Sequence, residues 1–198
     1  MTNISIMDNK DYTNIILEIF QEICKIPHPS GQEEAIGDYL MAFAKAHGLK
    51  AKKDNVGNIL ICKAAAKGCE KSPTVILQAH QDMVCEKDAA LIHDFMKQPI
   101  QTYIEDGWLK AKGTTLGADD GIGMAMMLAV LADSPLKHGP IEALFTVSEE
   151  TGLTGASNLG DDMINGKMLI NLDSEDEGEI FIGCAGGIKS EIEFHYNA

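Results

Sequence analysis

A histidine and an aspartate stand two residues apart at the end of an apolar run. Residues 75–83 read VILQAHQDM, so His80 and Asp82 close what looks like a strand. Successive strand side chains point to opposite faces, which places these two on the same side. A neutral imidazole can bind a metal through one nitrogen while a carboxylate holds the other N–H. The same pair also describes a loop histidine bonded to an aspartate, so the metal hypothesis depends on the rest of the chain.

Two further apolar runs also end in carboxylates. Residues 140–147 are followed by Glu149 and Glu150, and residues 168–172 are followed by Asp173. Both runs are short and largely apolar, which predicts buried strands. Adjacent side chains of an extended segment point in opposite directions, so the two glutamates permit one metal ligand and one general base.

Two adjacent aspartates, Asp119 and Asp120, precede an apolar segment at 122–131 that we expect to be helical. The positive end of a helix attracts carboxylates, but a capping role explains one aspartate and not both. Carboxylates that converge on one histidine repel each other unless a cation lies between them. Two divalent ions about 3.5 Å apart, sharing a carboxylate and a water, would use this many ligands. Imidazole with carboxylates suits zinc, manganese or cobalt better than copper or an iron–sulfur cluster.

The remaining pattern alternates strands with helices. Helical periodicity predicts two opening helices over 12–26 and 30–47, and Ser30 with Glu33 has the spacing of a capping box. His28 and His47 then fall at helix ends and are not counted as ligands. The other predicted elements are strands at 50–53 and 58–64, a loop at 83–100 and a hairpin at 103–111. This order predicts an α/β fold whose ligands bind beyond the carboxyl ends of the strands.

Composition excludes several classes of protein. The chain has 198 residues and a formal net charge of −14, without the clustered Lys and Arg that nucleic-acid binding needs. No run approaches the roughly 18 apolar residues of a membrane span, so we expect a cytoplasmic protein. The five cysteines form no C-x-x-C pair, and we expect them to be reduced; they are Cys24, Cys62, Cys69, Cys85 and Cys184.

Other catalytic and metal-binding motifs do not fit. The sequence has no G-x-S-x-G elbow, Walker A loop or H-E-x-x-H helix. Asp173 begins a segment that resembles a calcium loop with Gly178 at its sixth position, but Cys184 stands where the twelfth position requires a glutamate. We therefore expect residues 175–179 to be a solvated acidic loop.

Four motifs together resemble a known family. In chain order they are His80-Gln81-Asp82, Gly117-Ala118-Asp119-Asp120-Gly121, Ser148-Glu149-Glu150-Thr151-Gly152 and Leu172-Asp173. They resemble the di-zinc metallopeptidase family of aminoacylases, carboxypeptidases and dipeptidases. Within it, residues 78–83, 93–95 and 115–123 are most similar to the dipeptidases that cleave Xaa-His dipeptides.

The resemblance implies a centre of two zinc ions, with manganese or cobalt as possible replacements. By the family pattern, His80 and Asp173 bind one ion and Glu150 binds the other. Asp119 bridges the pair.

The same resemblance implies the catalytic roles. Asp82 orients the metal-binding histidine. Glu149 is the general base, which takes a proton from the attacking water and later gives it to the leaving amine. The peptide bond before Asp120 is typically cis in this family, so we expect it to be cis here.

The resemblance also implies a domain organisation. We expect residues 1–186 to be the N-terminal part of a three-layer α/β/α catalytic domain with a mixed, mostly parallel central sheet, truncated relative to the family. The family has a further zinc-binding histidine near its C-terminus and an inserted lid and dimerisation domain, and we expect residues 187–198 to begin that lid. His195 has the spacing of a strand residue and not that of the missing ligand. An apolar stripe with strand spacing is formed by Ile188, Ile192, Phe194 and Tyr196.

The function implied is hydrolysis of Xaa-His dipeptides, with a small dipeptide substrate, no nucleic-acid or membrane partner, and a homodimer in the complete chain. We expect residues 1–198 alone to be impaired. Alternatives on the same scaffold are a tripeptidase, a deacylase or a carboxypeptidase. A non-catalytic metal-binding domain is a further alternative, against which the extra glutamate beside Glu150 argues. The sequence identifies no substrate-binding residues.

Overall fold

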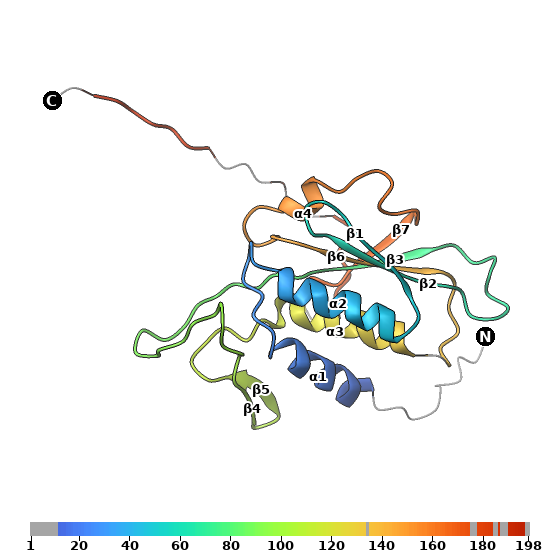
Figure 1. The fold of residues 1–198 in the computed structure, drawn as a ribbon, viewed down its shortest axis with the longest axis horizontal. Helices are drawn as coiled ribbons and strands as arrows, with labels where there is room; N and C mark the ends of the chain where they lie inside the picture. The colour runs from blue at the N-terminus through green and yellow to red at the C-terminus, as the bar shows by residue number, and fades with distance from the viewer. Residues whose placement is uncertain (1–11, 134, 175–177, 184–185, 187–189, 197–198) are drawn as a thin grey trace.

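A five-stranded sheet with the order β1-β2-β6-β3-β7 organises the chain (Figure 1). The computed structural model describes residues 12–133, 135–174, 178–183, 186 and 190–196. The sheet strands are β1 Lys50–Lys53, β2 Ile59–Lys63, β3 Val75–His80, β6 Ile141–Thr146 and β7 Met168–Asn171. A separate hairpin is formed by β4 Thr102–Glu105 and β5 Trp108–Ala111. The helices are α1 Tyr12–Ile23, α2 Glu34–Ala46, α3 Ala118–Ala132 and the short α4 Thr154–Ser157.

The central strands β6 and β3 are parallel and end at the same level. Their register pairs His80 with Thr146, and β3 also runs parallel to β7. The segments that leave β3, β6 and β7 therefore start at one edge of the sheet, as expected for parallel strands. Most of the predicted site residues lie at this edge, at or after the carboxyl ends of these strands.

Helices α1, α2 and α3 cover one face of the sheet (Figure 1). Their apolar sides meet the strands in one core, which includes Phe20 of α1, Leu40 of α2, Leu128 of α3 and Phe145 of β6, all fully buried. Gly121 lets α1 and α3 approach closely, because a Cβ atom there would lie 2.8 Å from the Phe20 ring. This packing fixes the start of α3 against α1.

The opposite face of the sheet has a smaller core of Leu60, Ile76, Leu144 and Met163. The segment that follows α4 covers this core, and Glu142 of β6 holds that segment through hydrogen bonds. The Glu142 carboxylate accepts bonds from the backbone N–H groups of Asn165 and Gly166 and from the Asn165 side chain. The described residues thus place long helices on one face and mainly loop on the other.

The α/β class with a mixed sheet is confirmed, and so are the predicted helices, hairpin and strands within a few residues. Of the four strand pairings within the described five-stranded sheet, two are parallel and two are antiparallel, so the parallel share is smaller than predicted. The four described cysteines are free, as expected. Cys184 and residues 175–177 lie outside the described part. No helix in the described part is long and apolar enough to cross a membrane.

Two predictions about the second half of the chain are wrong. Strand β7 is not buried: Met168, Leu169 and Ile170 are 52%, 49% and 46% exposed, because β7 is the last strand of the sheet in the described part. Residues 190–196 form no strand, since no described strand pairs with them, and Phe194 is 82% exposed. Ile188, the first residue of the predicted stripe, lies outside the described residues.

Candidate metal centre

His80 lies at the end of β3 with its side chain buried and only 1% of the residue exposed. Its Nε2 atom is 2.9 Å from Oδ1 of Asp119. Its Nδ1 atom is 2.9 Å from the backbone oxygen of Asp82 and 3.4 Å from the Asp82 carboxylate. The predicted pair is therefore adjacent in space, and the ring is held at both nitrogens.

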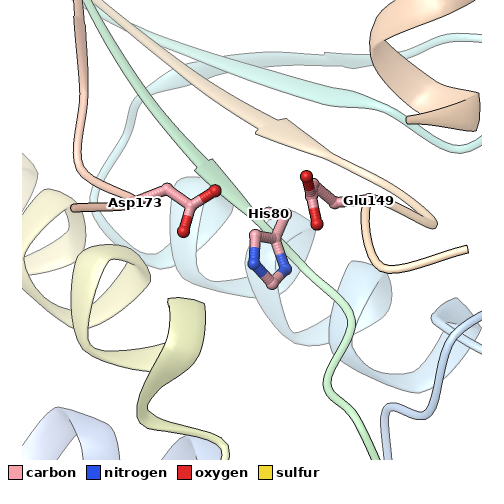
Figure 2. Close-up of side chains that lie close together, drawn as sticks. All are labelled: His80, Glu149 and Asp173. Atoms are coloured by element: carbon pink, nitrogen blue, oxygen red, sulfur yellow. The ribbon is translucent and has the colours of Figure 1, made fainter. Parts of the chain in front are cut away.

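Two groups of ligand atoms meet at this histidine. One group is His80, Glu149 and Asp173, and the other is His80, Asp119 and Glu150. Within each group the ligand atoms all lie within 4.8 Å of one another. Figure 2 shows the Asp173 and Glu149 carboxylates on either side of the imidazole ring. The structure thus brings together every residue that the sequence proposed as a ligand or base.

The start of α3 explains why two aspartates stand there. Asp120 is buried, and its carboxylate accepts bonds from the backbone N–H of Gly123 in α3 and of His80 in β3, at 3.2 and 3.3 Å. Asp120 therefore caps the helix and ties it to the strand. Asp119 is left to face the histidine. The peptide bond between the two aspartates is cis, as expected.

The electrostatics of the histidine and its neighbour are complementary. Burial opposes the protonated form of His80, but Asp82 and Asp119 outweigh it and raise the pKa to about 10. Burial likewise opposes ionisation of Asp82, but bonds from His80, the Glu149 N–H and the Ser30 hydroxyl lower its pKa to about 2. The positive charge of a protonated His80 and the negative charge of Asp82 thus stabilise each other.

The other carboxylates are harder to ionise. Burial, together with the charges of Asp173 and Asp119, raises the pKa of Asp120 to about 7. Burial and the neighbouring Asp119 and Glu149 raise that of Asp173 to about 6. The pKa of Glu150 is raised by burial and by Asp119. Repulsion of this kind is relieved by a divalent cation, and one imidazole with several carboxylates is a donor set that zinc accepts.

The Asp82 carboxylate also fixes the segment that follows β6. It accepts bonds from the backbone N–H groups of Glu149 and Glu150, at 2.9 and 3.3 Å, and from the hydroxyl of Ser30 at 2.7 Å. One buried carboxylate thus connects the end of β3, the turn after β6 and the loop before α2.

The predicted capping box before α2 is wrong. Glu33 occupies the N-cap position of α2, but no side chain caps this helix. The Ser30 hydroxyl bonds to Asp82, and the Glu33 carboxylate accepts bonds from Ser148 instead. Asn58, which the sequence did not single out, is fully buried and also holds the turn after β6. The only sequence signal for these long-range contacts was the spacing of Ser30 and Glu33, and that spacing fits a local helix cap equally well.

The remaining histidines lie outside both groups. His28 is buried, with Nδ1 2.6 Å from the backbone oxygen of Ile26. His47 is exposed, and its Nδ1 lies 2.9 Å from the backbone oxygen of Phe43. His47 is the C-cap residue of α2, which is the helix-end position predicted for it.

A pocket of about 290 Å³ opens beside the metal groups. Val84, Thr115 and Leu116 contribute to its largely apolar wall, and Asp119 and Glu150 lie at its metal side. Such a pocket can hold a small apolar or aromatic side chain next to the reacting centre.

A mixed α/β sheet with acidic residues around one histidine at its carboxyl edge agrees with the family assignment. Residues 76–195 match the peptidase family M20/M25/M40, and the chain belongs to that family. It is similar to the cytosol non-specific dipeptidase of Escherichia coli strain K12, with 53% identity over 90% of this chain. It is also similar to the solved aminoacylhistidine dipeptidase of Vibrio alginolyticus, with 47% identity, a TM-score of 0.81 and 86% of this chain covered.

A more distant solved relative is a tripeptidase of Staphylococcus aureus, with 26% identity, a TM-score of 0.70 and 82% of this chain covered. The chain spans 37% of the Escherichia coli relative, 36% of the Vibrio protein and 44% of the tripeptidase. The similarity thus extends over less than half of each relative.

Proposed function

We propose that this chain carries the metal centre of a dipeptidase that hydrolyses Xaa-His dipeptides in the cytoplasm. The observation that carries the proposal is the convergence of Asp119, Glu149, Glu150 and Asp173 on the buried His80. The substrate class comes from the named activity of the Vibrio relative, at 47% identity. The proposed location in the cytoplasm is taken from the name of the Escherichia coli relative, a cytosol dipeptidase.

The proposed cofactor is zinc, two ions in the complete centre, with manganese or cobalt also compatible with the donors. His80 and Asp173 would hold one ion and Glu150 the other, with Asp119 shared between them. Bound zinc lowers the pKa of a coordinated water toward neutrality and polarises the scissile carbonyl.

Glu149 is the proposed general base. Its carboxylate is half-buried and faces the His80 ring, where it can take a proton from the attacking water and pass it to the leaving amine. Asp82 supports this role, because it bonds the Glu149 N–H and lies against the same imidazole. Asp82 is therefore proposed to orient both the histidine and the base.

The pocket beside Asp119 is proposed to accept one side chain of the dipeptide. Its apolar wall of Val84 and Leu116 suits the faces of an imidazole or an aliphatic side chain. Tripeptide hydrolysis is the second candidate because of the likeness to the Staphylococcus tripeptidase. A panel of β-alanyl-histidine, alanyl-histidine and trialanine distinguishes the two.

The test uses zinc-loaded chain and the substitution Glu149→Gln, with the exposed Glu191→Gln as matched control. We expect Glu149→Gln to lower kcat by at least ~100-fold without changing the zinc content, because the amide cannot accept the proton. Residues 1–198 span just over a third of the relatives, so we expect slow turnover by this chain alone. Full activity in Glu149→Gln would refute the role of the base, and β-alanyl-histidine turnover equal to that of the Vibrio relative would refute the expected impairment.

We further propose that residues 1–186 are one catalytic unit and that residues 187–198 begin a lid that also supports a homodimer in the complete protein. Residues 190–196 are exposed and form no helix or strand, which supports a boundary before them. Limited proteolysis should leave a folded core that ends near residue 186. Protection of residues 190–196 from cleavage would contradict this boundary.

A further inference from the structure

The turn after β6 depends on an unusual backbone conformation at Ser148. The residue has φ of +49°, in the left-handed region that residues other than glycine rarely adopt. The chain reverses there, and the next two residues are Glu149 and Glu150, whose carboxylates join the two ligand groups. The direction of both glutamates therefore follows from the conformation of Ser148.

The carboxylate of Glu33, the N-cap residue of α2, holds this conformation. Oε1 of Glu33 accepts bonds from the backbone N–H of Ser148 at 2.9 Å and from its hydroxyl at 2.8 Å. The same oxygen accepts the N–H of Gly31 at 2.9 Å, which fixes the carboxylate relative to its own loop. Bonds to an ionised carboxylate are stronger than those between neutral groups.

The two ends of the turn are held separately. Asn58 accepts the N–H of Val147 at 3.1 Å and donates to the backbone oxygen of Gly155 at 2.9 Å. Asp82 holds the backbone N–H groups of Glu149 and Glu150 independently of Glu33. Removal of Glu33 therefore leaves these anchors in place and takes away the acceptor of the Ser148 N–H and hydroxyl.

We propose that Glu33 is a positioning residue for the metal centre: it holds Ser148 in the left-handed conformation and so turns Glu149 and Glu150 toward His80. The roles of these glutamates rest on the proposed function. The coupling between Glu33 and Ser148 does not, because it can be measured without metal.

The first measurement is amide hydrogen exchange on the metal-free chain. In Glu33→Ala we expect exchange at the Ser148 amide to accelerate at least ~10-fold, since its acceptor is removed. The Val147 amide is bonded to Asn58 and serves as the internal control that stays protected. Unchanged exchange at Ser148 would overturn the proposal, whether or not the chain binds metal.

The second measurement is a titration with Co²⁺ followed by its visible absorption, which reports on the ligands. We expect Glu33→Ala to weaken binding about 10-fold and to change the spectrum, as loss of an outer contact to a ligand does. Glu34→Gln, an exposed neighbour, should match the parent chain. An unaltered affinity and spectrum in Glu33→Ala would contradict the positioning role.

The glycine substitution Ser148→Gly separates positioning from a general structural effect. Glycine adopts a positive φ without a steric penalty, so the turn no longer needs Glu33 to hold it. We expect Glu33→Ala to weaken Co²⁺ binding by no more than about 3-fold in the Ser148→Gly background. An equal loss in both backgrounds would mean that Glu33 acts elsewhere. If the parent chain binds no Co²⁺, the proposed function fails. The exchange experiment still decides whether Glu33 holds Ser148.

Discussion

Replacement of Asp82 by asparagine tests the connection between the end of β3 and the turn after β6. Asparagine preserves the shape of the side chain but turns one oxygen into an NH₂ group. One carboxylate oxygen of Asp82 accepts the Glu149 N–H, and the other accepts the Ser30 hydroxyl and the Glu150 N–H. Whichever way the amide points, its NH₂ faces at least one donor.

The expected magnitude follows from these bonds. Hydrogen bonds to a charged group contribute about 1.5–3 kcal/mol each, and a donor left without an acceptor costs about 1–3 kcal/mol. Loss of one bond and weakening of the others gives an expected destabilisation of about 2–4 kcal/mol for Asp82→Asn. In a domain of this size that corresponds to a fall in Tm of roughly 5–15 °C.

The assay is urea denaturation of the metal-free chain followed by far-ultraviolet circular dichroism. The matched control is Asp38→Asn, an exposed aspartate on α2, which should change the free energy of unfolding by less than about 0.5 kcal/mol. A loss below about 1 kcal/mol in Asp82→Asn would refute the view that its carboxylate joins the two segments.

Three further predictions concern other parts of the fold. Burial opposes ionisation of Glu142, but hydrogen bonds from Gly166 and Asn165 lower its pKa below the ordinary 4.5. The stabilising contribution of its carboxylate is therefore present above pH 4.5 and is lost as the pH falls through the folded pKa. The difference in unfolding free energy between the parent chain and Glu142→Gln should therefore shrink from pH 7 to pH 3 in urea titrations, and a difference independent of pH would contradict this. A Cβ at Gly155 would lie 2.4 Å from Oδ1 of Asn58, so Gly155→Ala should destabilise the fold by about 1–3 kcal/mol. The control is Gly183→Ala, whose added Cβ meets nothing within 4 Å and should leave Tm unchanged. Equal Tm values for the two variants would contradict this prediction. The metal-free pKa is raised to about 6 for Asp173 and to about 10 for His80, so zinc binding should release protons and zinc affinity should rise with pH from about 5 to 7. Calorimetry in buffers of different ionisation enthalpy counts the released protons, and a count that does not fall between about pH 5 and pH 7 would argue against Asp173 as a ligand.

The elements of the sheet could be predicted because their signals are local. Apolar runs such as 75–80 and 141–147 define buried strands by composition, and the carboxylates that follow them reach one edge because the strands are parallel. The exposure of β7 could not be predicted in this way. Its residues are as apolar as those of β6, and only their place in the sheet separates an edge strand from a central one.

The contacts that hold the site are long-range, and residue types alone do not reveal them. Ser30 and Glu33 have the spacing of a capping box, yet their partners are Asp82 and Ser148, which lie 52 and 115 residues further along the chain. A serine and a glutamate satisfy either arrangement, so only the fold decides. The two aspartates at the start of α3 show the same limit, because their position indicates two roles, and only the resemblance to a family assigned the bridging role to Asp119.

The most direct test of the metal centre is the zinc content of the chain after exhaustive dialysis, measured by elemental analysis for the parent and for Asp119→Ala. Asp119 lies 2.9 Å from His80, the residue common to both ligand groups, and it is proposed to be shared by the two ions, so its loss should affect both. We expect roughly one tightly held zinc per parent chain, lost in Asp119→Ala and retained in the exposed control Asp38→Asn. Zinc absent from the parent chain, or retained in full by Asp119→Ala, would contradict it.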